Sequence, residues 1–400
     1  MRIAAALIAT ILLAGCVRVV PVGAPAPTAT PGPASSPAPS PSATPVPPAV
    51  SRGPSVASLR LAAEDARGAL ASFVESCPRL VGRTDASRLT TGADWRALCD
   101  TARAWPANDA VRFFESQFDT ARLGDGKTFI TGYFEPEIAG SRVRQPGYDV
   151  PVYRLPPDLI RAWPAATPAA ERTGNPPLGR YDETGAFVPY FDRAAIEDGA
   201  LAGKGLEIAW VADAAEFFFL QVQGSGLIRL PDDSLLRIGY AGQNGRGYTG
   251  IGSLMRTRGL IGEGPGQYPG TMQGILRYIR DNPEAGKALM RENLSWIFFK
   301  ENTGDGPLGS LNVPVRRGSS VAADPAYIPL GAPVWLDVDR AEADGLWIAQ
   351  DTGGAIKGVN RFDTFWGNGP EARVIAGGMS GRGDALLLLP KGVLARLLAR

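Results

Sequence analysis

Two segments of the chain show the signals of helices. In residues 58–73, apolar side chains recur at helical spacing and predict an amphipathic helix; these side chains are Leu59, Leu61, Ala66, Leu70 and Phe73. The triplet Asn282-Pro283-Glu284 predicts a second helix, because asparagine suits an N-cap, proline suits the first turn and an acidic residue complements the helix dipole. We expect this helix to end at about Glu292.

The rest of the body consists mostly of short apolar runs interrupted by glycine and proline, a pattern typical of sheets and barrels. Residues 219–225 alternate, which predicts a strand with Phe219, Gln221, Gln223 and Ser225 on one face. Residues 334–338 also alternate and predict a half-buried strand. The body is therefore expected to be mainly β with a few helices.

The first residues are typical of a targeting segment. An apolar run from Ile3 to Ala14 is too short to span a bilayer as a mature helix but fits the apolar region of a signal peptide. Small residues precede Cys16 as in a bacterial lipobox, whose cysteine is lipidated, so residues 1–15 are predicted to be a lipoprotein signal peptide. The alternative is an ordinary secretory signal with an incidental cysteine. By the same resemblance, Val17 favours the outer membrane.

Residues 16–55 are rich in proline, alanine and serine. This composition cannot bury a core and favours extended polyproline II structure. At about 3 Å per residue the segment spans on the order of 100 Å. It is predicted to be a tether between a membrane and a soluble body.

Composition excludes several classes of function. The net charge is +1 and no basic cluster occurs, which argues against nucleic acid as a partner. There is no histidine, so a Ser-His-Asp triad, a Cys-His pair and histidine zinc sites are impossible. The acidic residues lack the spacing of a calcium loop, and neither a metal nor another cofactor is predicted.

Two further cysteines, Cys77 and Cys99, remain in the body. Outside the cytoplasm such a pair is more often a disulfide than a metal site. The alternative is a reactive thiol, although no base accompanies either residue.

The densest candidate for chemistry is the segment 347–358. An apolar strand leads to Asp351, a glycine-rich turn follows, and a second carboxylate comes at Asp363. A capped turn beside an unrelated surface aspartate would look the same. An aspartic protease needs two Asp-Thr-Gly loops and the chain has one, while no phosphate-binding Gly-Lys-Ser/Thr loop occurs. Sugar chemistry fits better, because carboxyl groups protonate glycosidic oxygens without histidine.

At this point several motifs resemble one known family. Residues of about 318–368 resemble the three-aspartate (3D) domain, with Asp324-Pro325, Asp351-Thr352-Gly353-Gly354 and Arg361-Phe362-Asp363 in order. Upstream, the segments 131–136, 221–226 and 293–299 resemble the membrane-bound lytic murein transglycosylase A family. The similarity extends over about 125–390.

The resemblance implies a double-psi β-barrel, formed by residues 56–134 and 297–400, with a second, barrel-like β-domain inserted at 135–296 and a substrate groove between them. It implies cleavage of the β-1,4 bond between N-acetylmuramic acid (MurNAc) and N-acetylglucosamine (GlcNAc) in peptidoglycan. Such cleavage uses no water and leaves 1,6-anhydroMurNAc ends. The expected location is the periplasm, anchored to the outer membrane, and murein-synthesis complexes are the expected protein partners.

Asp363 matches the catalytic acid of that family. It must be protonated at neutral pH, so a raised pKa is expected from an apolar wall of Phe362, Phe365 and Trp366 and from a nearby ionised Asp351. Asp363 would act first as acid and then as base. Asp351 is assigned an electrostatic or orienting role, and for Asp324 a structural role is as plausible as a functional one.

A further set of residues is expected to bind the glycan. Thr131, Tyr133 and Phe134 match sugar-site positions, although the family often has tyrosine in place of Phe134, so that stacking is retained and one hydroxyl contact is not. The polar face of Gln221, Gln223 and Ser225 either binds the sugar or meets water. Lys357 either pairs with Asp351, meets a peptide-stem carboxylate or lies free on the surface. The cluster of Trp296, Phe298 and Phe299 is expected to be core.

Two other functions remain open. Expansin-like double-psi barrels bind polysaccharides without cutting them, although the presence of both Asp363 and Asp351 argues against this reading. A glycoside hydrolase on the same barrel would use Asp351 as base and differs only in its product.

Overall fold

The computed structural model describes residues 48–399. The predicted signal peptide, Cys16 and the tether as far as residue 47 lie outside the described residues. Within them, no helix has the length and apolar character needed to cross a membrane.

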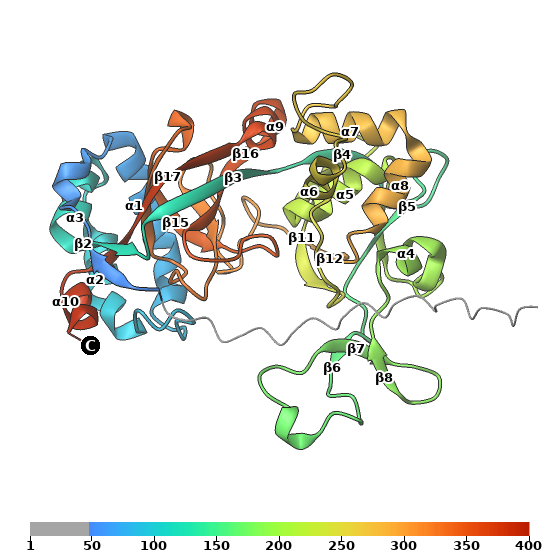
Figure 1. Cartoon of the computed structure of the whole chain (residues 1–400), viewed down its shortest axis with the longest axis horizontal. Coiled ribbons are helices and arrows are strands. Elements are labelled where there is room, and N and C mark those ends of the chain that lie inside the picture. Colours follow the sequence, from blue (N-terminus) through green and yellow to red (C-terminus); the bar gives the residue numbers. More distant parts are fainter. Residues whose placement is uncertain (1–47, 400) are drawn as a thin grey trace, which may run out of the picture. The chain divides into compact units, whose positions relative to one another are not determined.

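The described chain contains an eight-stranded, a six-stranded and a three-stranded sheet (Figure 1). The eight-stranded sheet comprises β1 (Val50–Arg52), β2 (Phe118–Leu123), β3 (Lys127–Glu135), β13 (Ser320–Ala323), β14 (Pro333–Val338), β15 (Gly345–Asp351), β16 (Arg361–Asn368) and β17 (Ser380–Pro390). The six-stranded sheet comprises β4 (Glu137–Ser141), β5 (Val150–Tyr153), β9 (Glu207–Val211), β10 (Ser225–Arg229), β11 (Leu235–Gln243) and β12 (Ile297–Glu301). The three-stranded sheet comprises β6 (Ile160–Arg161), β7 (Leu178–Tyr181) and β8 (Phe187–Pro189).

The helices lie between these strands in the chain. They are α1 (Ala63–Leu80), α2 (Gly92–Ala104), α3 (Ala110–Gln117), α4 (Arg193–Ala195), α5 (Ala214–Gln223), α6 (Ile251–Thr257), α7 (Met272–Asp281), α8 (Pro283–Arg291), α9 (Gly369–Gly378) and α10 (Val393–Leu398). The chain is sheet-rich, as predicted, but holds more helix than the sequence pattern indicated.

The largest sheet closes on itself. Its strands follow the order β17-β14-β15-β13-β16-β3, and β3 pairs again with β17. These strands come from two distant stretches of the chain: β3 and β16 lie side by side in parallel although more than half of the body separates them in sequence (Figure 1). A closed sheet has no free edge and holds its side chains at fixed positions.

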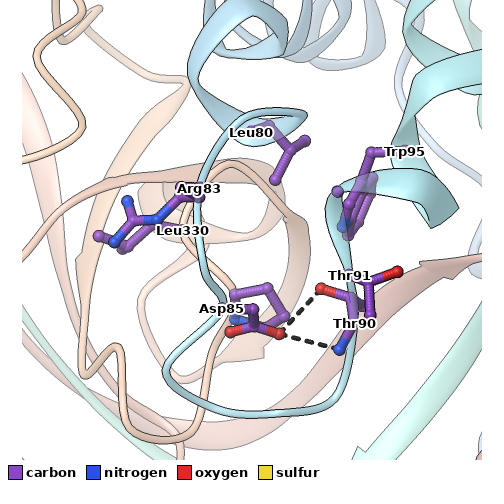
Figure 2. Close-up of a pocket in the computed structure, with 9 residues that line it drawn as sticks. Leu80, Arg83, Asp85, Thr90, Thr91, Trp95 and Leu330 are labelled. Carbon is purple, nitrogen blue, oxygen red and sulfur yellow. Dashed lines mark hydrogen bonds between the residues drawn. The ribbon is translucent and has the colours of Figure 1, made fainter.

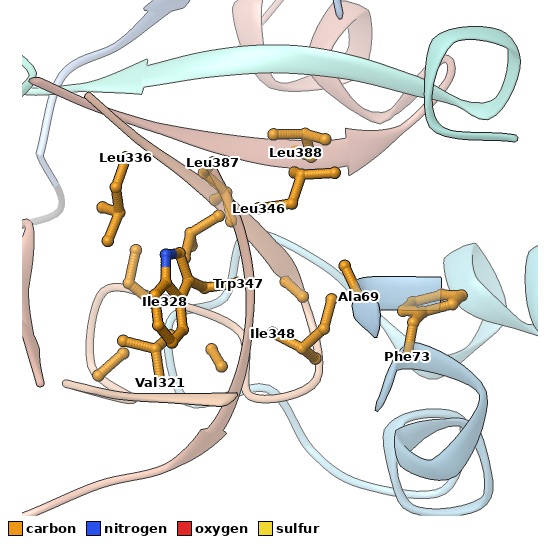
Figure 3. Packing of buried hydrophobic residues seen from close by; sticks show 14 of the residues in the cluster. Ala69, Phe73, Val321, Ile328, Leu336, Leu346, Trp347, Ile348, Leu387 and Leu388 are labelled. Carbon is orange, nitrogen blue, oxygen red and sulfur yellow. The ribbon is translucent and has the colours of Figure 1, made fainter. Parts of the chain in front are cut away.

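The main core fills this sheet and the space under α1. Trp347 and Ile348 of β15 are buried, and Ala69 and Phe73 of α1 belong to the same cluster (Figure 3). The interior aromatic and aliphatic side chains fix the strand carrying Asp351 against a helix. Trp296, Phe298 and Phe299 are buried in a second cluster, so their prediction as core is confirmed.

The disulfide prediction is confirmed: Cys77 at the end of α1 is bonded to Cys99 in α2. We expect the double variant Cys77→Ser/Cys99→Ser to lose about 3 kcal/mol of unfolding free energy, because the bridge restricts the unfolded chain. Urea denaturation measures the loss. Reductant should destabilise the wild type and leave the variant unchanged; equal sensitivity of both proteins would contradict the prediction.

Two predicted boundaries near the start of the body are wrong. The tether does not extend to residue 55, because Val50 pairs with Leu123 in the largest sheet and the Gly53 N–H donates to the Thr120 carbonyl. The helix predicted at 58–73 begins later and ends later, at Ala63–Leu80. Arg60 adopts a left-handed conformation (φ 54°), which breaks the helical run.

The predicted strand at 219–225 is also wrong. Residues 214–223 form the helix α5, and only Ser225 begins a strand. The helix is buried on more than one side, because Phe217 and Phe218 pack into different apolar clusters. The alternation of apolar and polar residues therefore does not indicate a strand here. Helix signals are present in the sequence: the Asp213 carboxylate caps the first turn, and Gly224 (φ 82°) ends the helix.

Two other predictions are confirmed. The helix α8 runs over Pro283–Arg291, although the Asn282 side chain donates to the Tyr278 carbonyl and does not cap it. The strand β14 has buried Val334, Leu336 and Val338 and an exposed Asp337.

Candidate active site

Pairing in the closed sheet brings the two candidate carboxylates into one row. Asp363 on β16 pairs with Thr131 on β3 and with Ala322 on β13, and Ala322 pairs with Asp351 at the end of β15. Only β13 therefore lies between the strands that carry Asp351 and Asp363. Neighbouring strands lie about 4.8 Å apart, so these two strands are about 10 Å apart.

The Asp363 carboxyl group is held by a directed hydrogen-bond chain. The Arg361 guanidinium donates to Thr131 Oγ1 (2.8 Å), and the Thr131 hydroxyl donates to Asp363 Oδ1 (2.5 Å). Because the Arg361 guanidinium can only donate, the Thr131 hydroxyl accepts from it and is left to donate its own hydrogen to Asp363. Asp363 Oδ1 is thus an acceptor, and Oδ2 is the oxygen left to carry a transferable proton.

The environment of Asp363 favours its protonated form. Burial raises the pKa of Asp363 to about 6, and the negative charge of Asp351 adds to the rise, whereas the Thr131 hydrogen bond and the Arg361 charge oppose it. The predicted raised pKa is confirmed in direction, and Asp351 contributes to it as expected. A carboxyl group with a pKa of about 6 is partly protonated near neutral pH.

The Asp351 carboxylate is held by three donors. The backbone N–H groups of Ser310 and Thr352 donate to Oδ1 (2.7 and 2.8 Å), and the Tyr133 hydroxyl donates to Oδ2 (3.2 Å). Burial raises the pKa of Asp351 to about 6, against these hydrogen bonds, which lower it. Its geometry is that of a fixed, oriented anion.

A small apolar cluster lies beside the two carboxyl groups, made of Tyr133, Val315, Ala322, Ile356 and Phe365. The rings of Tyr133 and Phe365 are 5.0 Å apart. The expected wall was only partly right: Phe365 lies on this side, whereas Phe362 and Trp366 belong to the main core. Side chains alternate along β16, so Phe362 and Trp366 point to the face opposite Asp363.

Asp324 has a structural arrangement. Its carboxylate accepts hydrogen bonds from the backbone of Ala326 (3.1 Å) and Gly358 (2.8 Å), and it is 7 % exposed. It therefore ties the glycine-rich loop after Asp351 to the turn at 324–328.

No group of three or more acidic, histidine or cysteine side chains in the region 48–399 is arranged to hold a metal ion. Acid–base chemistry at this site rests on the carboxyl groups.

Comparison with known proteins identifies the family. Residues 129–300 match the MltA specific insert domain and residues 319–389 match the 3D domain. The chain is 30 % identical to the membrane-bound lytic murein transglycosylase A of Vibrio cholerae, over 71 % of this chain and 73 % of that protein. The chain belongs to the membrane-bound lytic murein transglycosylase A family. It is thereby a member of a family of enzymes.

Solved structures of this family are similar in fold. A membrane-bound lytic murein transglycosylase from Agrobacterium tumefaciens is 29 % identical, with a TM-score of 0.71, covering 82 % of this chain and 95 % of that one. Escherichia coli MltA with bound chitohexaose is 27 % identical, with a TM-score of 0.56, covering 82 % of this chain and 90 % of that one.

The residues expected at the sugar site of this family lie in different environments. Thr131 and Tyr133 contact the two aspartates as described, but the Phe134 ring is only 4 % exposed and lies in the main core, so the expected stacking on a sugar is wrong. The Phe134 N–H donates to Gln223 Oε1 (3.0 Å).

The expected polar strand face does not exist, because α5 is a helix. Gln221 is 2 % exposed and its Oε1 accepts a hydrogen bond from buried Arg193 (2.7 Å), so it belongs to the interior. Gln223 and Ser225 are half-buried. Lys357 is exposed and takes part in none of the ion pairs found between residues 48 and 399, so the expected pairing with Asp351 is absent there.

Sequence reasoning missed three members of the site. Arg361 and Ser310 hold Thr131 and Asp351 through the hydrogen bonds described above. Tyr248, in the loop between β11 and α6, lies near Gly354; burial raises its pKa, and the negative charge of Asp363 adds to the rise. Alternation along β16 would have placed Arg361 beside Asp363, but nothing local in the sequence indicated Tyr248.

Proposed function

We propose that the chain is a lytic transglycosylase that cleaves the β-1,4 bond between MurNAc and GlcNAc in peptidoglycan and leaves 1,6-anhydroMurNAc ends. The observation that carries this proposal is the unequal hydrogen bonding of the two carboxyl groups. Burial raises the pKa of both to about 6, but Asp363 accepts one hydrogen bond and has a free Oδ2, whereas Asp351 accepts three. One carboxyl group with an oxygen free to exchange a proton matches a reaction that needs one acid–base residue.

The reaction balances on Asp363 alone. The Asp363 carboxyl group donates its proton to the glycosidic oxygen as the bond from that oxygen to C1 of MurNAc breaks. The C6 hydroxyl of the same sugar then forms a bond to C1, and its proton returns to Asp363. No water is consumed, and the enzyme ends in its starting state.

The other members of the site support this step. Thr131 and Arg361 orient the carboxyl group of Asp363 so that Oδ2 stays free for the proton. Asp351 provides a fixed negative charge beside the positive charge that develops on the sugar ring. Its hydrogen bonds to Ser310, Thr352 and Tyr133 hold that charge in place before the substrate binds.

The proposed architecture is a double-psi β-barrel with an inserted β-domain and a glycan groove between them. The closed sheet and the matches to an insert domain and a 3D domain support it. Chitohexaose, a β-1,4-linked GlcNAc polymer, is bound in the E. coli relative and supports a glycan ligand. Thr131, Tyr133, Gln223, Ser225 and Lys357 remain the proposed contacts.

We place the enzyme in the periplasm, anchored to the outer membrane through lipidated Cys16. The names of the relatives include "membrane-bound", which supports an anchor. Peptidoglycan strands are the proposed substrate, and murein-synthesis complexes are the proposed protein partners.

A hydrolase is the second candidate. Asp351 and Asp363 lie in one row with a single strand between them, and an inverting hydrolase needs two such carboxyl groups with room for a water between them. In that reaction Asp351 would activate water. Its three donors argue against a base, because they stabilise the carboxylate and occupy three of its about four lone-pair sites.

Mass spectrometry of the products decides between these functions. We expect purified peptidoglycan, digested by residues 48–400, to give muropeptides with anhydro ends. Reducing ends, heavier by one water, would establish the hydrolase. Binding to sacculi with no release of products would leave an expansin-like binding module.

A further inference from the structure

A cavity lies next to the candidate active site. Its volume is about 420 Å³, within the range of small-ligand sites. Its walls are formed by the end of α1 with the turn that follows, and by the turn at 310–312; they comprise Pro78, Arg79, Gly82, Arg83, Thr84, Ser310, Leu311 and Asn312.

One wall of this cavity is also part of the active site. Ser310 lines the cavity, and its N–H donates to Asp351 (2.7 Å). The neighbouring Leu311 N–H donates to the Gln350 carbonyl (3.1 Å). A Cβ atom at Gly309 would lie 2.5 Å from the Gln350 carbonyl oxygen and clash with it. The turn therefore packs directly against the end of β15. Ser310 thus contacts both the cavity and the Asp351 carboxylate.

The opposite wall carries two positive charges. Arg79 is exposed and Arg83 is half-buried, and neither forms an ion pair with another residue of the described chain. No aspartate or glutamate lines the cavity. The disulfide at Cys77, next to this wall, fixes the end of α1 to α2.

The carboxylates closest in sequence to the two arginines have other partners. The Asp85 carboxylate accepts hydrogen bonds from Ser87 and Thr90, and Figure 2 shows Arg83 on the side of this loop away from Trp95. The Glu75 carboxylate pairs with Arg316 (2.7 Å). The two arginines thus face the cavity with their hydrogen-bonding capacity available to a ligand.

We propose that this cavity is a subsite for a carboxylate on the arm that MurNAc bears at O3, either a carboxylate of the stem peptide or that of a lactyl group freed of its stem. This inference rests on the proposed function, because MurNAc is the sugar whose C1 reacts beside Asp351. The guanidinium fork of arginine matches a carboxylate in shape and charge. The site binds the arm and takes no part in bond cleavage.

The test compares three probes that differ in carboxylates: glycan strands with stem peptides, strands freed of stems by an amidase, which retain the lactyl carboxylate, and chitohexaose, which has none. The variants are Arg79→Ala/Arg83→Ala and, to retain the charge, Arg79→Lys/Arg83→Lys. The control is Arg96→Ala, which removes an exposed arginine of α2 outside the cavity. Steady-state kinetics give KM and kcat for both strands, and calorimetry gives the Kd of chitohexaose and of a free stem tripeptide.

For the alanine pair we expect KM on stem-bearing strands to rise about tenfold at unchanged kcat, since a charged hydrogen bond has about this effect. The lysine pair should restore most of the affinity, and chitohexaose binding should not change. A rise confined to stem-bearing strands assigns the carboxylate to the peptide, and a rise confined to amidase-treated strands assigns it to the freed lactyl group. An equal rise on both strands means that the subsite accepts either carboxylate of the arm.

An unchanged KM on both strands overturns the subsite. If the wild type forms no anhydro ends on any strand, the proposed function fails, but the tripeptide titration still decides the subsite. Weaker tripeptide binding by the alanine pair than by Arg96→Ala then supports it, and equal binding overturns it.

Discussion

Asp363→Asn should lower the rate of anhydroMurNAc formation by roughly 10²–10⁴-fold, because the asparagine amide neither donates a proton to the leaving oxygen nor accepts one from the C6 hydroxyl. The Thr131 hydroxyl can still donate to the amide oxygen, so the site should keep its shape. Mass spectrometry of anhydro muropeptides measures the rate. Asp337→Asn, an exposed aspartate of β14, is the matched control and should leave the rate unchanged.

The pH dependence follows from the raised pKa. Burial raises the pKa of Asp363 to about 6, so its protonated fraction falls as the pH rises above that value. We expect kcat/KM of the wild type to fall on the alkaline side with an apparent pKa of about 6. A rate that stays flat from pH 5 to 8 would remove Asp363 from the role of acid.

The same substitution should stabilise the fold. Because the folded-state pKa of Asp363 lies above the unfolded value of 3.8, its contribution to stability is complete below pH 3.8 and is lost as the pH rises through about 6. Asparagine has no such loss, so at pH 7 Asp363→Asn should gain about 3 kcal/mol of unfolding free energy. Urea denaturation at pH 4 and pH 7 should show the gain at pH 7 alone. A variant less stable than the wild type at pH 7 would contradict this account.

Sequence motifs were sufficient to predict the family and the two carboxyl groups but not the geometry of the site. The segment from Trp347 to Asp363 indicated a strand, a glycine-rich turn and two carboxylates, and the structure has them in that order. That Thr131 lies next to Asp363 depends on parallel pairing of β3 and β16, a register set by the closed sheet. Single-sequence patterns carry no information about such distant pairing.

The errors also have physical causes. Phe362 and Trp366 were expected beside Asp363 because they are neighbours in sequence, but strand alternation turns them into the core. Gln221 was placed on a polar strand face, which would bind the sugar or meet water, because polar and apolar residues alternate around it. In α5 the apolar residues pack into clusters on different sides, so hydrophobicity alone could not distinguish helix from strand.

Arg193→Met should cost about 3–5 kcal/mol of unfolding free energy, the largest stability effect we expect from one substitution. Arg193 is 2 % exposed; burial lowers its pKa to about 10, partly offset by Glu197, so it stays charged at neutral pH. Its guanidinium donates to the carbonyls of Asn293 (2.9 Å) and Ser295 (2.7 Å) and to Gln221 Oε1 (2.7 Å). Methionine fills a similar volume but leaves these acceptors buried and unpaired.

The matched control is Arg291→Ala, because Arg291 also pairs with Glu197 (2.7 Å) but lies closer to the surface. Its loss should cost no more than about 1 kcal/mol, as for other exposed ion pairs. Urea denaturation of both variants measures the difference. Equal losses would mean that Arg193 contributes only its ion pair with Glu197 and that the buried acceptors find other partners.

The Arg193 substitution should also weaken the active site from a distance. Arg193 holds Gln221 in α5, and two residues further on Gln223 accepts the N–H of Phe134 on β3, next to Tyr133 and close to Thr131. If α5 shifts, the strand that supports both aspartates loses a contact. We therefore expect Arg193→Met to lower kcat even at a temperature where the variant is fully folded, whereas Arg291→Ala should keep the wild-type kcat. An unchanged kcat in Arg193→Met would show that α5 does not transmit its position to β3.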